Sequence, residues 1–386
     1  MIRNVLLTEH ITSKPMVQVV SFLAGCQQKS GPGLLDLSIG NPDLPPSAEV
    51  IEALVGASRD PSIHGYGKFG GHPALKQRII EYYRTRYNVS IGPDELIVVR
   101  GIRSMIFTIA ALFAGTDDYV LLPSISYPSY YLAADLAGAR TCLIDVDESS
   151  DYMPDVSTIP EDILRKTAIL FLNYPNNPTG AAATKPILQQ AVNCAKEYGF
   201  LICYDNAYNE IVFDGREPLS ILEADGARDT GIEMFSLSKL ASLAGWRIAF
   251  CAGGSGIIEQ VHQLQSLTDT APYDGFQLAA ASALEEATTG LRGEAIARHY
   301  QERRDKLAHV LGRAGISYYL PQGGMYLWAK SPDGDGMEFT RFLFDTKRVL
   351  VTPGCYYGDS GAGHVRFSLA APQEVFDEAL LRLGTL

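Results

Sequence analysis

Short runs of apolar residues alternate with longer amphipathic segments through the middle of the chain. Apolar runs bounded by turn residues predict seven β-strands: Glu95–Val99, Tyr119–Leu122, Thr141–Ile144, Ala168–Asn173, Phe200–Tyr204, Glu233–Leu237 and Ile248–Ala252. Hydrophobic positions at helical spacing predict helices between them, among others Ser104–Phe113, Tyr130–Ala137 and Lys185–Tyr198. Mostly apolar strands joined by helix-length connections favour a mainly parallel sheet covered by helices on both faces. The predicted fold class is therefore α/β.

The end regions of the chain show a different pattern. A long charged segment predicts a helix over Glu294–Leu311, and short strands are expected near Ile316–Leu320, Met325–Ala329 and Val365–Leu369, before a final helix. This pattern predicts a second, smaller α/β domain, to which the N-terminal segment before Pro45 also contributes. The predicted division is a large domain over residues 46–284 and a small domain made of residues 1–45 and 285–386.

Composition narrows the class of protein. The chain has 386 residues, of which 46% are hydrophobic, and this is enough for a large core. Its net charge is −12 and it has no basic run, so nucleic-acid binding is not expected. No apolar stretch approaches the roughly 18 residues of a membrane span. The N-terminal stretch MIRNVLLTEHITSKP lacks the pattern of a secretion signal.

Cysteines and histidines give no sign of a disulfide framework or a metal site. The six cysteines are scattered without CxxC pairs, and several of them stand inside apolar runs, as in the stretch around Cys203. The seven histidines form no HExxH motif. We therefore expect a cytoplasmic protein without a bound metal.

Polar residues follow the ends of several predicted strands, in YPNNPTG, YDNAY and SLSK, and a glycine turn, RGIRS, opens a helix. Ligands of open α/β sheets gather at the carboxyl ends of the strands, so these residues are candidates for one site. The candidates from these stretches are Gly101, Asn176, Asn177, Asp205, Tyr208, Ser236, Ser238 and Lys239.

Each candidate also has a purely structural alternative. Asn-Pro-Thr-Gly is a common turn, and Asp205 could cap a helix that follows it. A glycine before a helix is a weak sign of an anion site, and a lysine after a strand is usually on the surface. The site is favoured because a carboxylate, an amide, a phenol, a lysine and a helix N-terminus are all expected at one sheet edge.

This set of groups suits a pyridine aldehyde that carries a phosphate. A lysine amine can condense with the aldehyde, and its nucleophilicity depends on a lowered pKa. A carboxylate beside the ring nitrogen keeps it protonated, so the ring can accept electrons. An amide and a phenol can bind the ring's phenolic oxygen. Backbone N–H groups at a helix start, hydroxyls and an arginine can hold the phosphate.

The stretch SLSKLASLAGWRIA, together with NNPTG, D-x-x-Y and HVRFS in this order, resembles the class I/II aminotransferases, which are pyridoxal-phosphate (PLP) enzymes of fold type I. Within this class the sequence is most similar to the branch of LL-diaminopimelate and alanine/glutamate aminotransferases. The resemblance implies a transaminase that moves an amino group between an L-amino acid and a 2-oxo acid, with ping-pong kinetics.

The resemblance also implies a role for each matching residue. Lys239 is expected to form the Schiff base and to move the Cα proton, and Asp205 to pair with the pyridine nitrogen. Asn177 and Tyr208 are expected at the phenolic oxygen, so Lys239, Asp205 and Tyr208 form the predicted catalytic set. The other predicted cofactor contacts are Tyr127 stacked on the ring, and Ile102, Arg103, Ser236, Ser238 and Arg247 around the phosphate.

The resemblance extends to the substrate and to a second subunit. Arg366, Gly40 and Asn177 are expected to bind the substrate, with Arg366 as a bidentate fork for its α-carboxylate. Tyr66 matches a tyrosine that reaches the phosphate of the neighbouring subunit, which implies a homodimer. Asp269 and Thr270 are expected near the interface.

Two stretches depart from the branch, and they leave the choice of substrate open. The residues after the lysine, LASLAGWR, are less polar than usual, and the phosphate turn reads GIRS, where a small residue followed by an amide or acid is usual. An alternative is a PLP enzyme of the same fold that catalyses elimination, cyclisation or oxidation in a specialised biosynthetic pathway. A transcriptional sensor is disfavoured because no basic winged-helix module precedes residue 40. A nicotinamide-dependent oxidoreductase is disfavoured because GxGxxG is missing after the first strand.

Overall fold

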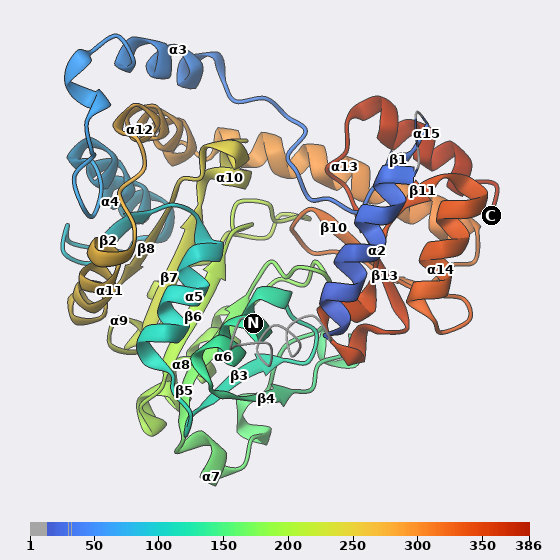
Figure 1. Cartoon of the computed structure of the whole chain (residues 1–386), viewed down its shortest axis with the longest axis horizontal. Helices are drawn as coiled ribbons and strands as arrows, with labels where there is room; N and C mark the ends of the chain where they lie inside the picture. The colour runs from blue at the N-terminus through green and yellow to red at the C-terminus, as the bar shows by residue number, and fades with distance from the viewer. Residues whose placement is uncertain (1–13, 30, 32) are drawn as a thin grey trace, which may run out of the picture.

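The computed structural model describes residues 14–29, 31 and 33–386. Figure 1 shows a larger part built around a seven-stranded sheet and a smaller part built around a four-stranded sheet. Outside the described residues lie 1–13, 30 and 32. They belong to the predicted small domain, and they include most of the N-terminal stretch that lacks a secretion-signal pattern.

The seven predicted strands of the large sheet are all present, and each of their ends lies within two residues of the predicted one. They are β2 (Leu96–Val99), β3 (Tyr119–Pro123), β4 (Arg140–Ile144), β5 (Thr167–Asn173), β6 (Leu201–Asn206), β7 (Gly231–Ser236) and β8 (Ala249–Gly253). Their order is β2-β8-β7-β6-β5-β3-β4, and β8 is antiparallel to both of its neighbours while the other pairs are parallel. The prediction of a mainly parallel α/β sheet is therefore confirmed.

Helices cover both faces of the large sheet because its strands are apolar on both sides. In β2, Leu96 and Val98 pack on one face, and Ile97 and Val99 pack on the other. The first face is covered by α4 (Pro73–Tyr87), α8 (Lys185–Tyr198) and α12 (Asp274–Thr288). The second face is covered by α5 (Ile102–Phe113), α6 (Pro128–Ala137) and α11 (Ser255–Thr268). The shorter helices α3 (Ala48–Ala57), α7 (Glu161–Leu164), α9 (Ala227–Thr230) and α10 (Leu237–Leu240) add buried side chains to the core on the first face.

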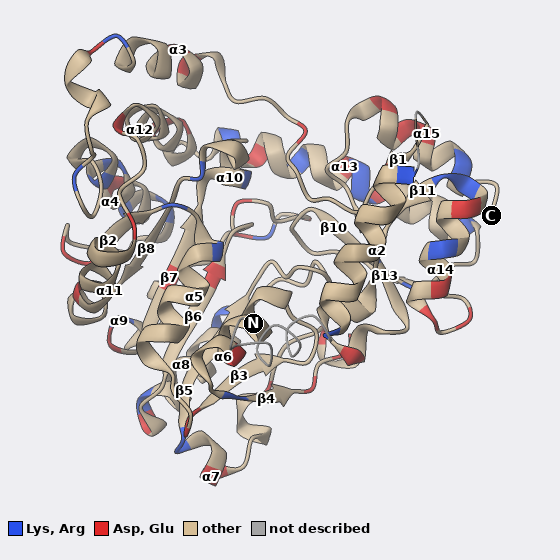
Figure 2. Cartoon of the chain, in the orientation of Figure 1, with Lys and Arg blue, Asp and Glu red and all other residues tan. Residues whose placement is uncertain are grey.

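Charged residues are nearly absent from the large sheet, and they gather on the helices and loops around it (Figure 2). The exceptions within its strands are Arg140, Asp205 and Glu233. The carboxylate of Glu233 is fully buried, and it accepts hydrogen bonds from Tyr83, Ser220 and the backbone of Ile221. Asp205 is different, because it lies at the carboxyl end of β6, where its side chain faces a cavity.

The smaller part contains an antiparallel sheet in the order β12-β13-β10-β9, with β9 (Tyr318–Tyr319), β10 (Tyr326–Lys330), β12 (Thr352–Pro353) and β13 (His364–Ser368). The predicted long helix is present and longer than expected, as α13 (Leu291–Arg313). The helices α2 (Pro15–Lys29), α14 (Gly336–Phe342) and α15 (Gln373–Leu383) complete this part. A short parallel pair of β1 (Leu35–Asp36) and β11 (Val349–Leu350), which was not predicted, joins the N-terminal segment to it.

The predicted domain boundary at residue 285 falls inside α12. Among the described residues, no helix is both long enough and apolar enough to cross a bilayer. The same residues contain no cluster of three or more His, Cys, Asp or Glu side chains that could hold a metal ion.

Candidate active site

A cavity of about 640 Å³ lies at the carboxyl ends of β5, β6 and β7, between the two parts of the molecule. It is lined by residues from the large sheet, from the N-terminal segment and from the smaller sheet. Of the residues to which the family resemblance gives a role in the site, all but Tyr66 line it, namely Gly40, Ile102, Arg103, Tyr127, Asn177, Asp205, Tyr208, Ser236, Ser238, Lys239, Arg247 and Arg366. Residues far apart in the sequence are therefore brought to one place.

Asp205 is a buried carboxylate with only one of its oxygens hydrogen-bonded. Oδ2 accepts a hydrogen bond of 2.8 Å from the hydroxyl of Tyr130, while Oδ1 is buried and has no partner within the described residues. Burial raises the pKa of the carboxyl to about 6, although the hydrogen bond from Tyr130 opposes this rise. A turn follows β6 in place of a helix, so Asp205 does not serve as a helix cap. A buried acceptor without a partner is costly, which indicates that a donor binds here.

Lys239 lies in the short helix α10 directly after β7, and its amine points into the cavity. The amine donates a hydrogen bond to the carbonyl of Gly40. Burial lowers the pKa of the amine, the neighbouring Tyr326 opposes this, and the cations of Arg366 and Arg247 lower it further. Lys239 is therefore not an ordinary surface lysine, and its environment favours the neutral, nucleophilic form of the amine.

The N-terminus of α5 and Arg247 form a positive corner of the cavity. Gly101 precedes the helix with a φ of +96°, and a Cβ atom there would lie only 2.5 Å from Nη2 of Arg247. Nearby, the hydroxyl of Ser236 accepts a hydrogen bond of 3.1 Å from the backbone of Ser238, which caps α10. Free backbone N–H groups at the start of α5, the guanidinium and two hydroxyls make a suitable anion site.

Arg366 is a buried cation without a carboxylate partner in the described part of the chain. It donates to Oδ1 of Asn177 at 2.8 Å, to the carbonyl of Ser38 at 2.5 Å and to the hydroxyl of Thr352 at 3.3 Å. Its guanidinium carbon lies 3.9 Å from the centroid of the Tyr326 ring, and its Nε is buried without a partner. Because none of these neighbours is a carboxylate, the charge of Arg366 is available for an anion in the cavity.

Two further pairs of side chains complete the lining. The guanidinium of Arg103 donates to the hydroxyl of Tyr127, with a distance of 2.8 Å from Nε. The hydroxyls of Tyr208 and Tyr326 are 3.1 Å apart. Asn176, by contrast, holds its own turn, because it donates to the carbonyl of Asn173 and accepts from Thr179. Of the two asparagines in NNPTG, only Asn177 faces the cavity.

Comparison with known proteins decides the family. Residues 32–383 match the family Aminotransferase class I and II. The chain is 35% identical to an LL-diaminopimelate aminotransferase of Dehalococcoides mccartyi over 383 residues, which cover 98% of both chains. It is also 35% identical to transaminase BacF of Bacillus subtilis, over 93% of this chain and 90% of that protein.

The chain belongs to the class I and II aminotransferases.

Solved structures agree with this assignment. A substrate-bound structure of BacF from Bacillus subtilis matches the aminotransferase with a TM-score of 0.91 at 34% identity, over 98% of this chain and 96% of that chain. An aspartate aminotransferase mutant from Thermus thermophilus matches with a TM-score of 0.87 at 26% identity, over 96% of both chains. The family is PLP-dependent, so the protein is a PLP-dependent enzyme of fold type I that transfers amino groups between amino acids and oxo acids.

The residues of the cavity fit this cofactor. The buried, unpaired oxygen of Asp205 suits the protonated ring nitrogen of PLP, and the amine of Lys239 suits its aldehyde. The positive corner made by α5 and Arg247 suits its phosphate. A site for a cofactor therefore explains the unpaired oxygen that no described residue satisfies.

Tyr66 is the predicted site residue of the aminotransferase that lies outside the cavity, and its side chain is 95% exposed. The two expected interface residues, Asp269 and Thr270, both contact Arg100. Thr270 accepts a hydrogen bond of 2.8 Å from it, and Asp269 forms an ion pair with it at 3.6 Å.

Several residues of the aminotransferase's site were missed in the sequence. Tyr130, which holds Asp205, follows Tyr127 at helical spacing, so its proximity was predictable in principle. Tyr326 and Thr352 stand in short strands without a polar motif, and no spacing pattern indicates that α2 lines the cavity with Val20, Leu23 and Ala24. The lining residues that were missed include Ser38, Tyr326 and Thr352, and Tyr130 was missed as the partner of Asp205 behind the lining.

Proposed function

We propose that Lys239 is the residue to which the cofactor attaches and the group that moves the proton at the Cα atom of the substrate. PLP supplies an aldehyde that condenses with amines and a ring that takes up the electrons left when this proton departs. The half-buried amine with its lowered pKa supports both roles of Lys239, because a neutral amine is both a nucleophile and a base.

We propose that Asp205 binds the ring nitrogen of the cofactor and that Tyr130 orients the carboxylate of Asp205. The hydrogen bond from Tyr130 fixes Oδ2 and leaves Oδ1 for the proton of the ring nitrogen. The positive charge of the ring would then offset the burial that raises the pKa of Asp205, so the carboxylate would stay ionised with the cofactor bound.

Asn177 and Tyr208 are proposed to contact the phenolic oxygen of the cofactor. The amide oxygen of Asn177 accepts from Arg366, so its amide nitrogen is the group that would donate to the phenolic oxygen. The hydroxyl of Tyr208 is oriented by the hydroxyl of Tyr326. Tyr127 would stack on the ring, and its hydroxyl is held by Arg103.

The phosphate is proposed to bind in the positive corner described above. The donors would be the backbone N–H groups of Ile102 and Arg103 at the start of α5, the hydroxyls of Ser236 and Ser238, and the guanidinium of Arg247. The φ of +96° at Gly101 supports this assignment, since it lets the helix start approach Arg247 without a clash.

The α-carboxylate of the amino acid or oxo acid is proposed to bind Arg366 and the backbone at Gly40. The observation that carries the assignment is that Arg366 is buried, faces the cavity and has no carboxylate partner among the described residues. A carboxylate is the anion that matches a guanidinium fork. Asn177 would link this group to the cofactor, because its amide oxygen accepts from Arg366.

A homodimer with shared active sites is proposed as the working state. The almost complete exposure of Tyr66 supports it, because a tyrosine so exposed is available to a second subunit. Mixing an inactive Lys239→Ala protein with an inactive Tyr66→Phe protein should restore part of the activity through hybrid dimers. No restoration, or a monomer in size-exclusion chromatography with light scattering, would contradict the shared site.

The division into two domains and the cellular location are two further proposals. The seven-stranded sheet lies within residues 96–253 and the four-stranded sheet within 318–368, which supports a large domain over 46–284 and a small domain made of 1–45 and 285–386. A cytoplasmic location is the other, and it is supported by the absence of a disulfide at Cys142, Cys194, Cys203, Cys251 and Cys355.

The decisive test of the proposed chemistry has two parts. Reduction of the loaded enzyme with borohydride, followed by digestion, should leave the cofactor label on the peptide that contains Lys239; a label elsewhere would refute its role. A screen of L-amino donors, including LL-diaminopimelate, against pyruvate and 2-oxoglutarate should then show formation of the matching amino acid. Release of ammonia without an amino acid product would instead favour elimination.

A further inference from the structure

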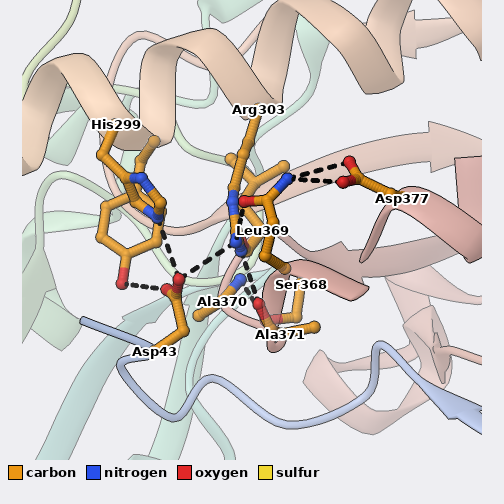
Figure 3. A network of polar contacts seen from close by, with 10 residues as sticks. Asp43, His299, Arg303, Ser368, Leu369, Ala370, Ala371 and Asp377 are labelled. Carbon is orange, nitrogen blue, oxygen red and sulfur yellow. Dashed lines mark hydrogen bonds and ion pairs between the residues drawn. The ribbon is translucent and has the colours of Figure 1, made fainter. Parts of the chain in front are cut away.

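A buried network of polar contacts joins three segments of the chain, which carry Asp43, Arg303 and Leu369 (Figure 3). The carboxylate of Asp43 accepts from His299 at 3.0 Å and from Tyr300 at 3.0 Å, and it pairs with Arg303 at 3.0 Å. The side chains of Asp43 and Arg303 are 7% and 3% exposed. Burial raises the pKa of the Asp43 carboxyl, but the hydrogen bond from His299 and the charge of Arg303 outweigh this and hold its pKa below the usual range. Asp43 and Arg303 therefore form a buried ion pair within this network.

Arg303 also holds the end of the strand that carries Arg366. Its Nη1 donates to the carbonyls of Leu369 at 2.7 Å and Ala371 at 2.6 Å, and these residues directly follow β13. Its Nη2 donates to Gln373 at 2.9 Å. One guanidinium thus fixes the chain only three residues beyond Arg366.

Asp43 in turn holds the segment that carries Ser38 and Gly40. The upstream end of this segment is fixed where Leu37 bonds to Leu350 and accepts from Ser368. The downstream end is fixed by Asp43. Between these two anchors, the carbonyl of Ser38 accepts from Arg366 and the carbonyl of Gly40 accepts from Lys239.

We propose that Asp43 and Arg303 are positioning residues, which set the distance between the two groups that bind the substrate carboxylate, Arg366 and the backbone at Gly40. The inference rests on the proposed function, because it takes this pair of groups as the carboxylate site. Neither Asp43 nor Arg303 lines the cavity, so neither touches the substrate. Both act through the segments that they hold.

The test uses Arg303→Lys in the PLP-loaded enzyme. A lysine keeps the charge but loses the fork that reaches two carbonyls and a carboxylate at once. A displacement of about 1 Å at a binding group costs up to about 100-fold, so we expect KM for both the amino donor and the oxo acid to rise about 10-fold, with kcat within about 3-fold. The dissociation constant of the α-methyl analogue of the best donor, which has no α proton to lose, should rise by the same factor.

The next residue of the chain provides a matched control. Arg304 is also buried, pairs with Asp214 and donates to the carbonyl of Pro321, but its contacts lead away from the carboxylate site. Arg304→Lys is expected to change the melting temperature about as much as Arg303→Lys and to leave KM within about 2-fold. If the two variants raise KM equally, or if Arg303→Lys lowers only the melting temperature, Arg303 is merely structural and the inference is wrong.

Two further variants keep the test decisive. Should Arg303→Lys fail to fold, Asp43→Asn, which preserves the shape of the side chain, is compared with Asp214→Asn by the same measurements. Arg366→Lys is measured in parallel. If Arg366→Lys weakens binding of the α-methyl analogue but Arg303→Lys and Asp43→Asn do not, only the positioning role is refuted. If Arg366→Lys leaves binding unchanged, the proposed carboxylate site itself is wrong, and the inference fails with it.

Discussion

The two walls of the active-site cavity are built in different ways. On the wall formed by the large sheet, Asp205, Ser236 and Lys239 lie at or just beyond the carboxyl ends of the adjacent strands β6 and β7. On the opposite wall, Arg366 bonds to Ser38, which lies 328 residues away in the sequence, and Thr352 bonds to the same carbonyl across 314 residues. The first wall is specified by local segments, and the second depends on how the smaller part packs.

This difference predicts which kinetic constant a substitution on each wall should change. The wall on the large sheet holds the groups proposed for the chemical steps, so changes there should lower kcat. The wall on the smaller sheet holds the groups proposed for the carboxylate, so changes there should mainly raise KM. The following predictions test this division.

The largest effect is expected for Lys239→Ala. This variant loses both the amine that attaches the cofactor and the base that moves the α proton, so kcat should fall by about 1,000-fold or more. Its absorption spectrum should be that of non-covalently bound PLP, and borohydride should leave no label on the protein. Substantial remaining activity would show that another base serves the reaction.

Asp205→Asn should lower kcat by about 100-fold, with a smaller change in KM. The amide cannot hold a proton on the ring nitrogen by its charge, so the ring accepts electrons less well. Tyr130→Phe, which keeps the charge and removes only the bond to Oδ2, is the matched variant and should lose about 5-fold. An equal loss in both variants would mean that orientation, and not charge, is what Asp205 provides.

The same Asp205→Asn substitution should stabilise the cofactor-free protein. The folded-state pKa of about 6 is above the usual value, so ionising Asp205 in the folded chain costs stability as the pH rises from 4 to above 6. At pH 8 the variant should therefore be more stable by about 2 to 3 kcal/mol, and the difference should vanish below pH 4. Urea unfolding of both proteins at several pH values would measure this, and a constant difference at every pH would contradict it.

The same division explains what could be predicted from the sequence. The strands of the large sheet are apolar on both faces and sharply bounded. The fold class was therefore predicted, and so were most residues of the cavity wall on the large sheet, including Lys239 and Asp205. The short strands β1 and β11 have two residues each and show no usable pattern. Tyr326 lies in an apolar strand, and its place under Arg366 follows only from packing. On the opposite wall, only Arg366 and Gly40 were therefore predicted, through the family resemblance.

Arg366→Lys is expected to raise KM for both the donor and the oxo acid by about 10- to 100-fold, because one charged fork is replaced by a single charge that cannot bind a carboxylate with two parallel bonds. The kcat should change much less than in Asp205→Asn. Full progress curves with both substrates would measure the two constants. A loss confined to kcat would break the proposed division between the walls.

The smallest effect is expected for Tyr326→Phe, and it tests the contact between the two walls. Burial raises the pKa of the Tyr326 hydroxyl, but the cations of Arg366 and Lys239 outweigh this and lower it, and Tyr326 in return raises the pKa of Lys239. Removing the hydroxyl should therefore lower the pKa of Lys239 further. In the cofactor-free protein, the rate of PLP attachment rises with pH as the amine loses its proton, so this rise should move to lower pH in Tyr326→Phe. The kcat should change only about 3-fold, since the substitution removes one hydrogen bond, to Tyr208. Stopped-flow measurements of attachment between pH 6 and 10 would detect the shift, and a shift to higher pH would show that Tyr326 does not stabilise the protonated amine.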